Sequence, residues 1–185
     1  MYSGGFHCMQ ACPPRLHWGV TLIELLVTLS VLAIVLTLGV GGFRHLIANT
    51  KMTNAANSLI AHLQFARSEA VKRGTDVSLC PSSDGASCVA SSDGSWEIGY
   101  IVRVDSTGEV LRRVDGTEMG GLTVTKSGAA SRIAFKPDGS AGGFACTLTI
   151  CDTGDFSNKR GVLISNVGRV RVSDYASGGG ALTCP

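Results

Sequence analysis

Apolar residues follow three different patterns along the 185-residue chain, and each pattern predicts a different element. The first is an almost unbroken apolar run from Val20 to Phe43. As a helix, this run would rise about 36 Å, which is enough to cross a hydrocarbon layer of about 30 Å. It exceeds the hydrophobic core of a secretory signal peptide and has no small-residue cleavage site at its end. Residues 20–43 are therefore expected to form a transmembrane anchor.

The second pattern is a helical stripe in residues 44–74. Apolar side chains recur there at three- and four-residue spacing, which places them on one face of a helix. Lys72 and Arg73 suit the negative end of a helix, and Gly74 is a typical helix stop. We predict one long helix over residues 20–73, whose amphipathic second half packs on a globular domain. The stripe consists of Met52, Ala55, Ala56, Leu59, Leu63, Ala66 and Ala70.

Beyond Gly74 the apolar period changes from 3.6 residues to 2, which is the period of β-strands. Turn signals separate the strands at Asp84-Gly85, Asp93-Gly94, Asp115-Gly116 and Asp138-Gly139. Short strands at this spacing are typical of antiparallel sheet, so residues 75–185 are expected to form a β-rich head and the fold class to be α+β. The predicted strands are Thr75–Cys80, Ile98–Val104, Glu109–Val114, Leu122–Thr125, Arg132–Lys136, Cys146–Cys151, Gly161–Ser165 and Gly168–Ser173.

Composition limits the function. The chain has 16 basic and 14 acidic residues, and this near balance argues against a protein that coats nucleic acid by bulk charge. Its 24 glycines fit the many turns of the head. We find no Ser-His-Asp constellation and no glycine loop of the phosphate-binding kind. No catalytic residue and no cofactor are therefore predicted.

Glu24 interrupts the apolar run near its start. A carboxylate is costly in lipid and therefore points to a function, and at a helix N-terminus it also faces a favourable dipole. The surrounding segment resembles the start of the type IV prepilins, in the stretch Gly19-Val20-Thr21-Leu22-Ile23-Glu24-Leu25-Leu26. In that family a leader peptidase cuts after the glycine, the new N-terminus is methylated, and the fifth mature residue is a glutamate.

The resemblance implies that residues 1–19 are a leader, that cleavage follows Gly19 and that Val20 is then N-methylated. Most family members have Phe where this chain has Val20. Met9 is an alternative start that would give a shorter leader. Glu24 would neutralise the N-terminal amine of a neighbouring subunit during assembly. Charge counting does not fix the orientation, so a cytoplasmic N-terminus follows from the resemblance alone.

Further segments narrow the resemblance to the minor pilins of the GspH/FimT group, and within it to the FimT-like pilins that bind DNA. The resemblance implies a lollipop-shaped, non-enzymatic pilus subunit with a single span in the bacterial inner membrane and a periplasmic head, which becomes extracellular after assembly. Its partners would be other pilins, the prepilin peptidase and the inner membrane. The alternative is a structural or priming minor pilin, or the pseudopilin H of a type II secretion system. The segments are Ala66–Gly74, Trp96–Tyr100, Phe135–Gly139 and Gly168–Arg171.

Cysteines supply the next candidate chemistry. Cleavage after Gly19 would remove two of the seven, and the other five would lie outside the membrane, where disulfides persist. Spacing alone leaves their connectivity open. We expect Cys80 to pair with Cys88 across a turn, and Cys151 to pair with Cys184, which would tie down the glycine-rich C-terminal end. One cysteine is left over.

The sequence predicts no metal site. Zinc is the rival interpretation of the cysteines, but the chain has no CxxC pair and no histidine at ligand spacing from them. Asp152 and Asp155 lie in a glycine turn that lacks a full set of calcium ligands. His62 lies beside the apolar stripe and is expected to be a surface residue.

The main binding candidate is the segment Gly168–Val172. Alternate side chains of a strand share a face, so Arg169 and Arg171 would stand together outside while Val170 and Val172 point into the core. Two planar guanidinium groups held in this way suit successive phosphates. The alternative is a solvated strand edge with cross-strand salt bridges.

Lys159 and Arg160 precede the adjacent strand and would enlarge this basic patch. Residues 159–185 contain four basic residues and one acid. In FimT-like pilins a Gly-Arg-x-Arg motif is associated with DNA capture in natural transformation, and the resemblance assigns that function to Gly168, Arg169 and Arg171. Binding to double-stranded DNA would then be weak, independent of sequence and sensitive to salt.

Overall fold

The computed structural model describes residues 19–89, 96–128, 131–152 and 158–184, and it leaves the side chains of residues 38–45 undescribed. The predicted leader therefore lies outside the described residues, except for Gly19. Backbone contacts divide the chain into two compact units, residues 1–41 and residues 42–185. Each unit is described by itself.

A single helix, α1 (Leu22–Arg73), spans both units, as predicted. Thr21 caps its start, because the backbone N–H of Glu24 donates to Thr21 Oγ1 at 3.3 Å. Thr21 and Glu24 have the spacing of a capping box. The helix ends at Arg73. The next residue, Gly74, has a left-handed φ of 64° and donates its N–H to the carbonyl of Ala70 at 3.0 Å.

The first unit is an apolar helix segment. All of its described helical residues, 22–37, are exposed, and the exposed fractions of Leu22 and Ile23 are 83% and 65%. Within the residues whose side chains are described, no helix has both the length and the apolarity of a membrane span. The predicted span, residues 20–43, runs into residues 38–45, whose side chains lie outside that part of the chain.

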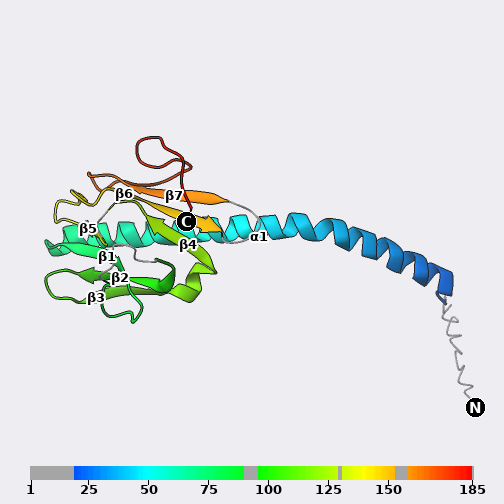
Figure 1. The fold of residues 1–185 in the computed structure, drawn as a ribbon. Helices are drawn as coiled ribbons and strands as arrows, with labels where there is room; N and C mark the ends of the chain where they lie inside the picture. The colour runs from blue at the N-terminus through cyan, green and yellow to red at the C-terminus, as the bar shows by residue number, and fades with distance from the viewer. Residues whose placement is uncertain (1–18, 90–95, 129–130, 153–157, 185) are drawn as a thin grey trace, which may run out of the picture. The chain divides into compact units, whose positions relative to one another are not determined.

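The second unit packs the rest of α1 against two antiparallel sheets (Figure 1). All seven residues of the predicted stripe are buried in one core to which both sheets contribute, with Leu59 and Leu63 fully buried. The first sheet has the order β3-β2-β1-β5 and the second the order β4-β6-β7-β8. The strands are β1 (Val77–Pro81), β2 (Gly99–Val104), β3 (Val110–Asp115), β4 (Leu122–Lys126), β5 (Ile133–Phe135), β6 (Cys146–Asp152), β7 (Lys159–Ile164) and β8 (Val170–Ser173).

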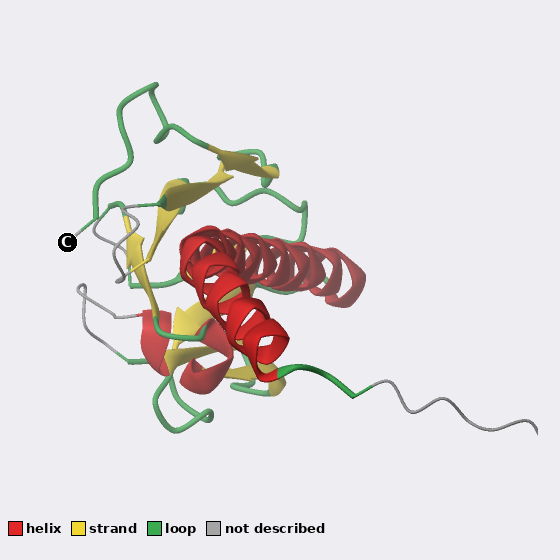
Figure 2. Cartoon of the chain, turned by 90° about the vertical axis from the view of Figure 1, so that its right-hand side faces the viewer, coloured by secondary structure: helices red, strands yellow, loops and turns green. Residues whose placement is uncertain are grey.

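All eight predicted strands are present, with ends shifted by up to a few residues, and the α+β fold class is confirmed. Viewed along the helix, the strands lie around one side of it (Figure 2). Two short 3-10 helices, η1 (Trp96–Ile98) and η2 (Gly116–Met119), were not predicted. The expected turn at Asp115-Gly116 is the start of η2, while the expected turn at Asp93-Gly94 lies outside the described residues.

The segment Trp96–Tyr100 belongs to the core. Trp96 and Tyr100 are each 1% exposed, and burial raises the pKa of Tyr100 to about 12. His62 Nδ1 lies 2.9 Å from the Tyr100 hydroxyl. The expectation of a surface His62 is therefore wrong: its ring is partly buried because it packs edge-on against Tyr100.

Acid is expected to destabilise the second unit through His62. Burial, and then the positive charge of Arg112, hold the pKa of His62 below its usual value of 6.5. The unfolded chain therefore binds this proton more tightly than the folded chain, and stability falls as the pH drops below about 6.5. His62→Gln should flatten the pH dependence of the urea unfolding midpoint between about pH 7 and pH 5. A variant with the wild-type slope would contradict this assignment.

Candidate functional site

The Gly168–Arg171 segment forms the turn between β7 and β8 and the start of β8. The N–H of Gly168 donates to the Ser165 carbonyl at 2.8 Å, and the N–H of Ser165 donates to the Arg169 carbonyl at 3.0 Å. Gly168 is buried and has a φ of 75°. A β-carbon there would overlap the carbonyl oxygen of Gly139. Position 168 therefore requires glycine for two reasons: the left-handed backbone angle and the close approach of the Gly139 loop.

Arg67 of α1 joins these two loops to the helix. Its Nε donates to the Gly139 carbonyl at 2.8 Å, and its Nη2 donates to the Val167 carbonyl at 3.3 Å. The helix, the Gly139 turn and the β7–β8 turn thus meet at one guanidinium group. Three of the four segments that carry the family resemblance, which are separated in sequence, form this junction.

Arg169 and Arg171 line one groove of about 490 Å³ on the second sheet, as the alternation of strand side chains predicts. Both are exposed. Among the described residues, neither forms an ion pair, and no acidic residue lines the groove. The lining residues include Leu163, Ser165 and, from the C-terminal segment, Ser177 and Gly178. The two guanidinium groups are thus available to an external anion.

Arg169 also lines a second groove of about 660 Å³, between α1 and β8. Lys72 and Arg67 line it as well, together with Asp138. Asp138 accepts a hydrogen bond from the Ser140 N–H at 2.8 Å, and the hydrogen bonds from Ser140 hold the pKa of this carboxyl below its usual value. The basic residues outnumber the acid in this groove too.

Lys159 and Arg160 do not join the Arg169–Arg171 pair. Arg171 lies opposite Leu163 in the β7–β8 register, and Lys159 is four positions from Leu163, about 13 Å along the strand. Arg160 lies on the other face of β7, where its Nη1 donates to Thr53 Oγ1 of α1 at 3.2 Å. The structure thus brings together two of the four basic residues grouped by the sequence analysis.

Val172 also differs from the expectation. Val170 is partly buried and packs against the core, but Val172 is 41% exposed. The cause is its place on β8, the edge strand of the second sheet, which has a neighbour on one side only.

Both expected disulfides are present, Cys80–Cys88 and Cys151–Cys184. The remaining described cysteine, Cys146, is buried in the core, and burial raises the pKa of its thiol to about 11.

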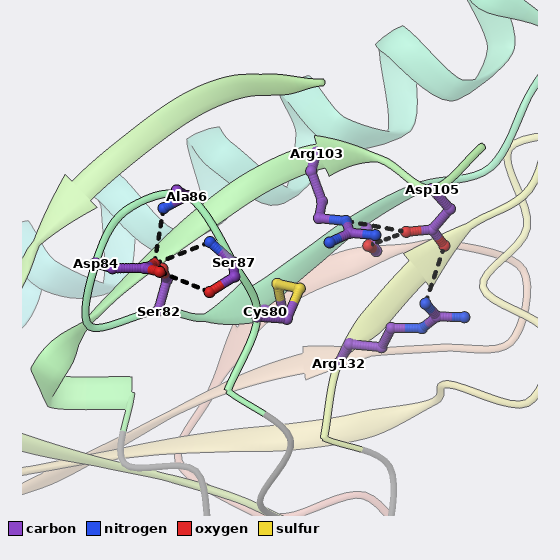
Figure 3. Close-up of a disulfide and its surroundings, with 10 residues drawn as sticks. Cys80, Ser82, Asp84, Ala86, Ser87, Arg103, Asp105 and Arg132 are labelled. Carbon is purple, nitrogen blue, oxygen red and sulfur yellow. Dashed lines mark hydrogen bonds and ion pairs between the residues drawn. A yellow bond between two sulfur atoms is a disulfide. The ribbon is translucent and has the colours of Figure 1, made fainter. Parts of the chain in front are cut away.

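Figure 3 shows the loop closed by the Cys80–Cys88 disulfide. Asp84 accepts hydrogen bonds there from the backbone N–H groups of Ala86 and Ser87, each at 2.8 Å. This disulfide therefore holds an ordered turn.

The three predicted processing and assembly residues lie at the start of α1. Gly19 and Val20 precede the helix and are exposed, and Glu24 is exposed in its first turn. This accessibility is what a peptidase or a neighbouring subunit would require.

We find no group of three or more potential metal-ligating side chains among the described residues. Asp152 ends β6, and Asp155 lies outside the described part of the chain. Sequence reasoning missed two parts of the site, the Arg67 junction and the C-terminal wall of the groove. The only sequence signal for the first was the presence of Arg67 within a family-like segment.

Comparison with known proteins identifies the fold. The family described as "Type II transport protein GspH" matches residues 55–168. The chain is similar to the type IV minor pilin FimU of Pseudomonas aeruginosa (strain PAO1), in crystal structures in space groups P21 and P65. The sequence identity is 28% in both cases, with TM-scores of 0.56 and 0.53. The matches cover 69% and 67% of this chain and 93% and 95% of the FimU chains.

A search among curated proteins finds no significant match. The family match extends over more than half of the chain and contains the last part of α1, from residue 55 onward, the Gly139 turn and Gly168. The packing of α1 on antiparallel sheets agrees with the similarity to FimU. The chain belongs to the GspH family, as a minor type IV pilin or GspH pseudopilin whose role is structural and not enzymatic.

Proposed function

We propose that this chain is a minor subunit of a type IV pilus that binds double-stranded DNA through Arg169 and Arg171 for uptake in natural transformation. The observation that carries the DNA part is the groove that both arginines line without an acidic neighbour. Guanidinium groups bind phosphate oxygens through paired, charge-assisted hydrogen bonds, which fix a protein on DNA without reading its sequence.

The filament part of the proposal rests on the first unit. Residues 22–37 are mostly apolar and all exposed, so this surface requires an apolar partner. We propose that the inner membrane covers it before assembly and that neighbouring pilins cover it in the extracellular filament. Leader peptidase would cut after Gly19, methylation would follow at Val20, and the head would be periplasmic before assembly.

Glu24→Ala is expected to leave membrane insertion intact and to abolish incorporation into pili, because the carboxylate would no longer neutralise the N-terminal amine of a neighbour. Glu24→Gln separates this function from helix capping, since Gln also completes a capping box. Both variants should be absent from sheared pili and present in the membrane fraction on immunoblots. Normal incorporation of Glu24→Gln would show that the charge is not required.

Arg169→Gln/Arg171→Gln is expected to weaken DNA binding at least tenfold. The negative slope of log K against log salt should also become shallower by about 2, because each phosphate that the protein neutralises contributes roughly −0.9 to this slope. Fluorescence anisotropy with a labelled duplex, from low to physiological salt, measures both quantities. The matched control is Lys51→Gln/Lys159→Gln, which removes the same charge from two exposed residues outside the groove.

Equal effects of the two double variants would show that DNA binding depends on the net charge of the protein and not on the groove. An unchanged affinity in the arginine variant would favour the second candidate, a structural or priming subunit without a DNA function. The similarity to a minor pilin and to the type II transport family supports that candidate as well.

A further inference from the structure

The C-terminal segment covers the outer face of the second sheet. Cys146, Leu148 and Ile150 of β6 belong to the core, so Thr147 and Cys151 point to the opposite face. There, Thr147 Oγ1 accepts a hydrogen bond from the Ser177 N–H at 3.1 Å, and Cys151 is bonded to Cys184.

Two further contacts fold this segment onto the sheet. Leu182 is 2% exposed, and its side chain lies over Gly161 of β7, where a β-carbon would meet it at 2.9 Å. A bridge between Tyr175 and Ala181 closes the loop that contains Ser177 and Gly178. The segment is thus attached to the sheet at both ends, and these contacts hold its loop in position against the sheet.

This position makes the loop one side of the arginine groove. Arg169 and Arg171 lie at the β8 edge, and Ser177 and Gly178 line the same groove from the C-terminal segment. The N–H groups of Ser177 and Gly179 donate within the protein. The N–H of Gly178, in contrast, has no hydrogen-bond acceptor in the part of the chain that the structure describes.

We infer that the groove is a phosphate subsite with two sides, in which Arg169 and Arg171 bind successive DNA phosphates and the loop at Ser177–Gly178 contributes backbone contacts from opposite them. The Cys151–Cys184 disulfide holds the loop in place. This inference rests on the proposed function and adds a residue set that the Gly-Arg-x-Arg motif does not contain. Phosphate oxygens accept hydrogen bonds from backbone N–H groups as well as from arginine.

The test uses the full-length protein in detergent micelles and a short fluorescent duplex of mixed sequence. Cys151→Ser/Cys184→Ser should weaken binding roughly tenfold, the effect of losing one charge-assisted hydrogen bond. Cys80→Ser/Cys88→Ser removes the other disulfide, which closes a loop of the first sheet, and should leave the affinity at the wild-type value.

A second pair of variants keeps both disulfides and therefore does not depend on how well the cysteine variants fold. Ser177→Asp should weaken binding, and Ser177→Lys should strengthen it, by several-fold each because the loop faces the phosphate. Ser83→Asp and Ser83→Lys make the same charge changes at an exposed position in the Cys80–Cys88 loop and should have smaller effects.

Equal effects at Ser177 and Ser83, together with wild-type affinity after loss of Cys151–Cys184, would overturn the inference and leave the C-terminal segment as a cover for the sheet. That result is distinct from failure of the proposed function, in which Arg169→Gln/Arg171→Gln would bind DNA like the wild type.

Discussion

Replacing Gly168 with alanine is expected to lower the free energy of unfolding by about 2–5 kcal/mol, from a left-handed backbone angle and a steric overlap together. The φ of 75° alone disfavours alanine. The new β-carbon would also overlap the Gly139 carbonyl oxygen, which accepts the hydrogen bond from Arg67. The overlap therefore separates the two loops that Arg67 joins. Urea unfolding followed by the fluorescence of the buried Trp96 measures the loss.

Gly108→Ala is the matched control for this variant. Gly108 has the same φ of 75°, but a β-carbon there would have no neighbour within 4 Å. Its loss should be limited to the conformational part, about 1–2 kcal/mol. If both alanine variants lost the same free energy, the close approach to Gly139 would make no contribution. Gly168→Ala should also weaken DNA binding, because Arg169 follows directly in the chain.

The long elements could be predicted because burial imposes its period on the sequence. Leu59, Leu63 and Ala66 recur at helical spacing since that face of α1 meets both sheets, and the eight strands alternate for the same reason. The 3-10 helices have three and four residues, too few to show a period. The end of α1 was predictable from Gly74, because the left-handed conformation favours glycine there.

The site was predictable only in its local part. Alternation along one strand placed Arg169 and Arg171 together, and no tertiary information was needed for that. The separation of Lys159 from them depends on the β7–β8 register, and the exposure of Val172 depends on β8 being an edge strand. Neither property is encoded in the segment itself. The contacts of Arg67 likewise join residues 72 and 100 positions away.

Removal of the Cys151–Cys184 disulfide is expected to destabilise the protein more than removal of Cys80–Cys88. The two bridges join residues separated by 33 and by 8 positions. In the chain-entropy treatment a longer closed loop restricts the unfolded chain more, and the losses are about 3.7 kcal/mol for the first bridge and about 2.5 kcal/mol for the second. The serine double variants, unfolded in urea with Trp96 as the reporter, give the comparison.

The order of the two losses also shows where each bridge acts. Without Cys80–Cys88, the loop retains the hydrogen bonds to Asp84, so the folded state keeps its local order. Without Cys151–Cys184, the C-terminal segment depends on buried Leu182 and on the hydrogen bond to Thr147. A larger loss for Cys80–Cys88 would mean that native contacts in the loops, and not loop closure in the unfolded chain, determine the stabilisation.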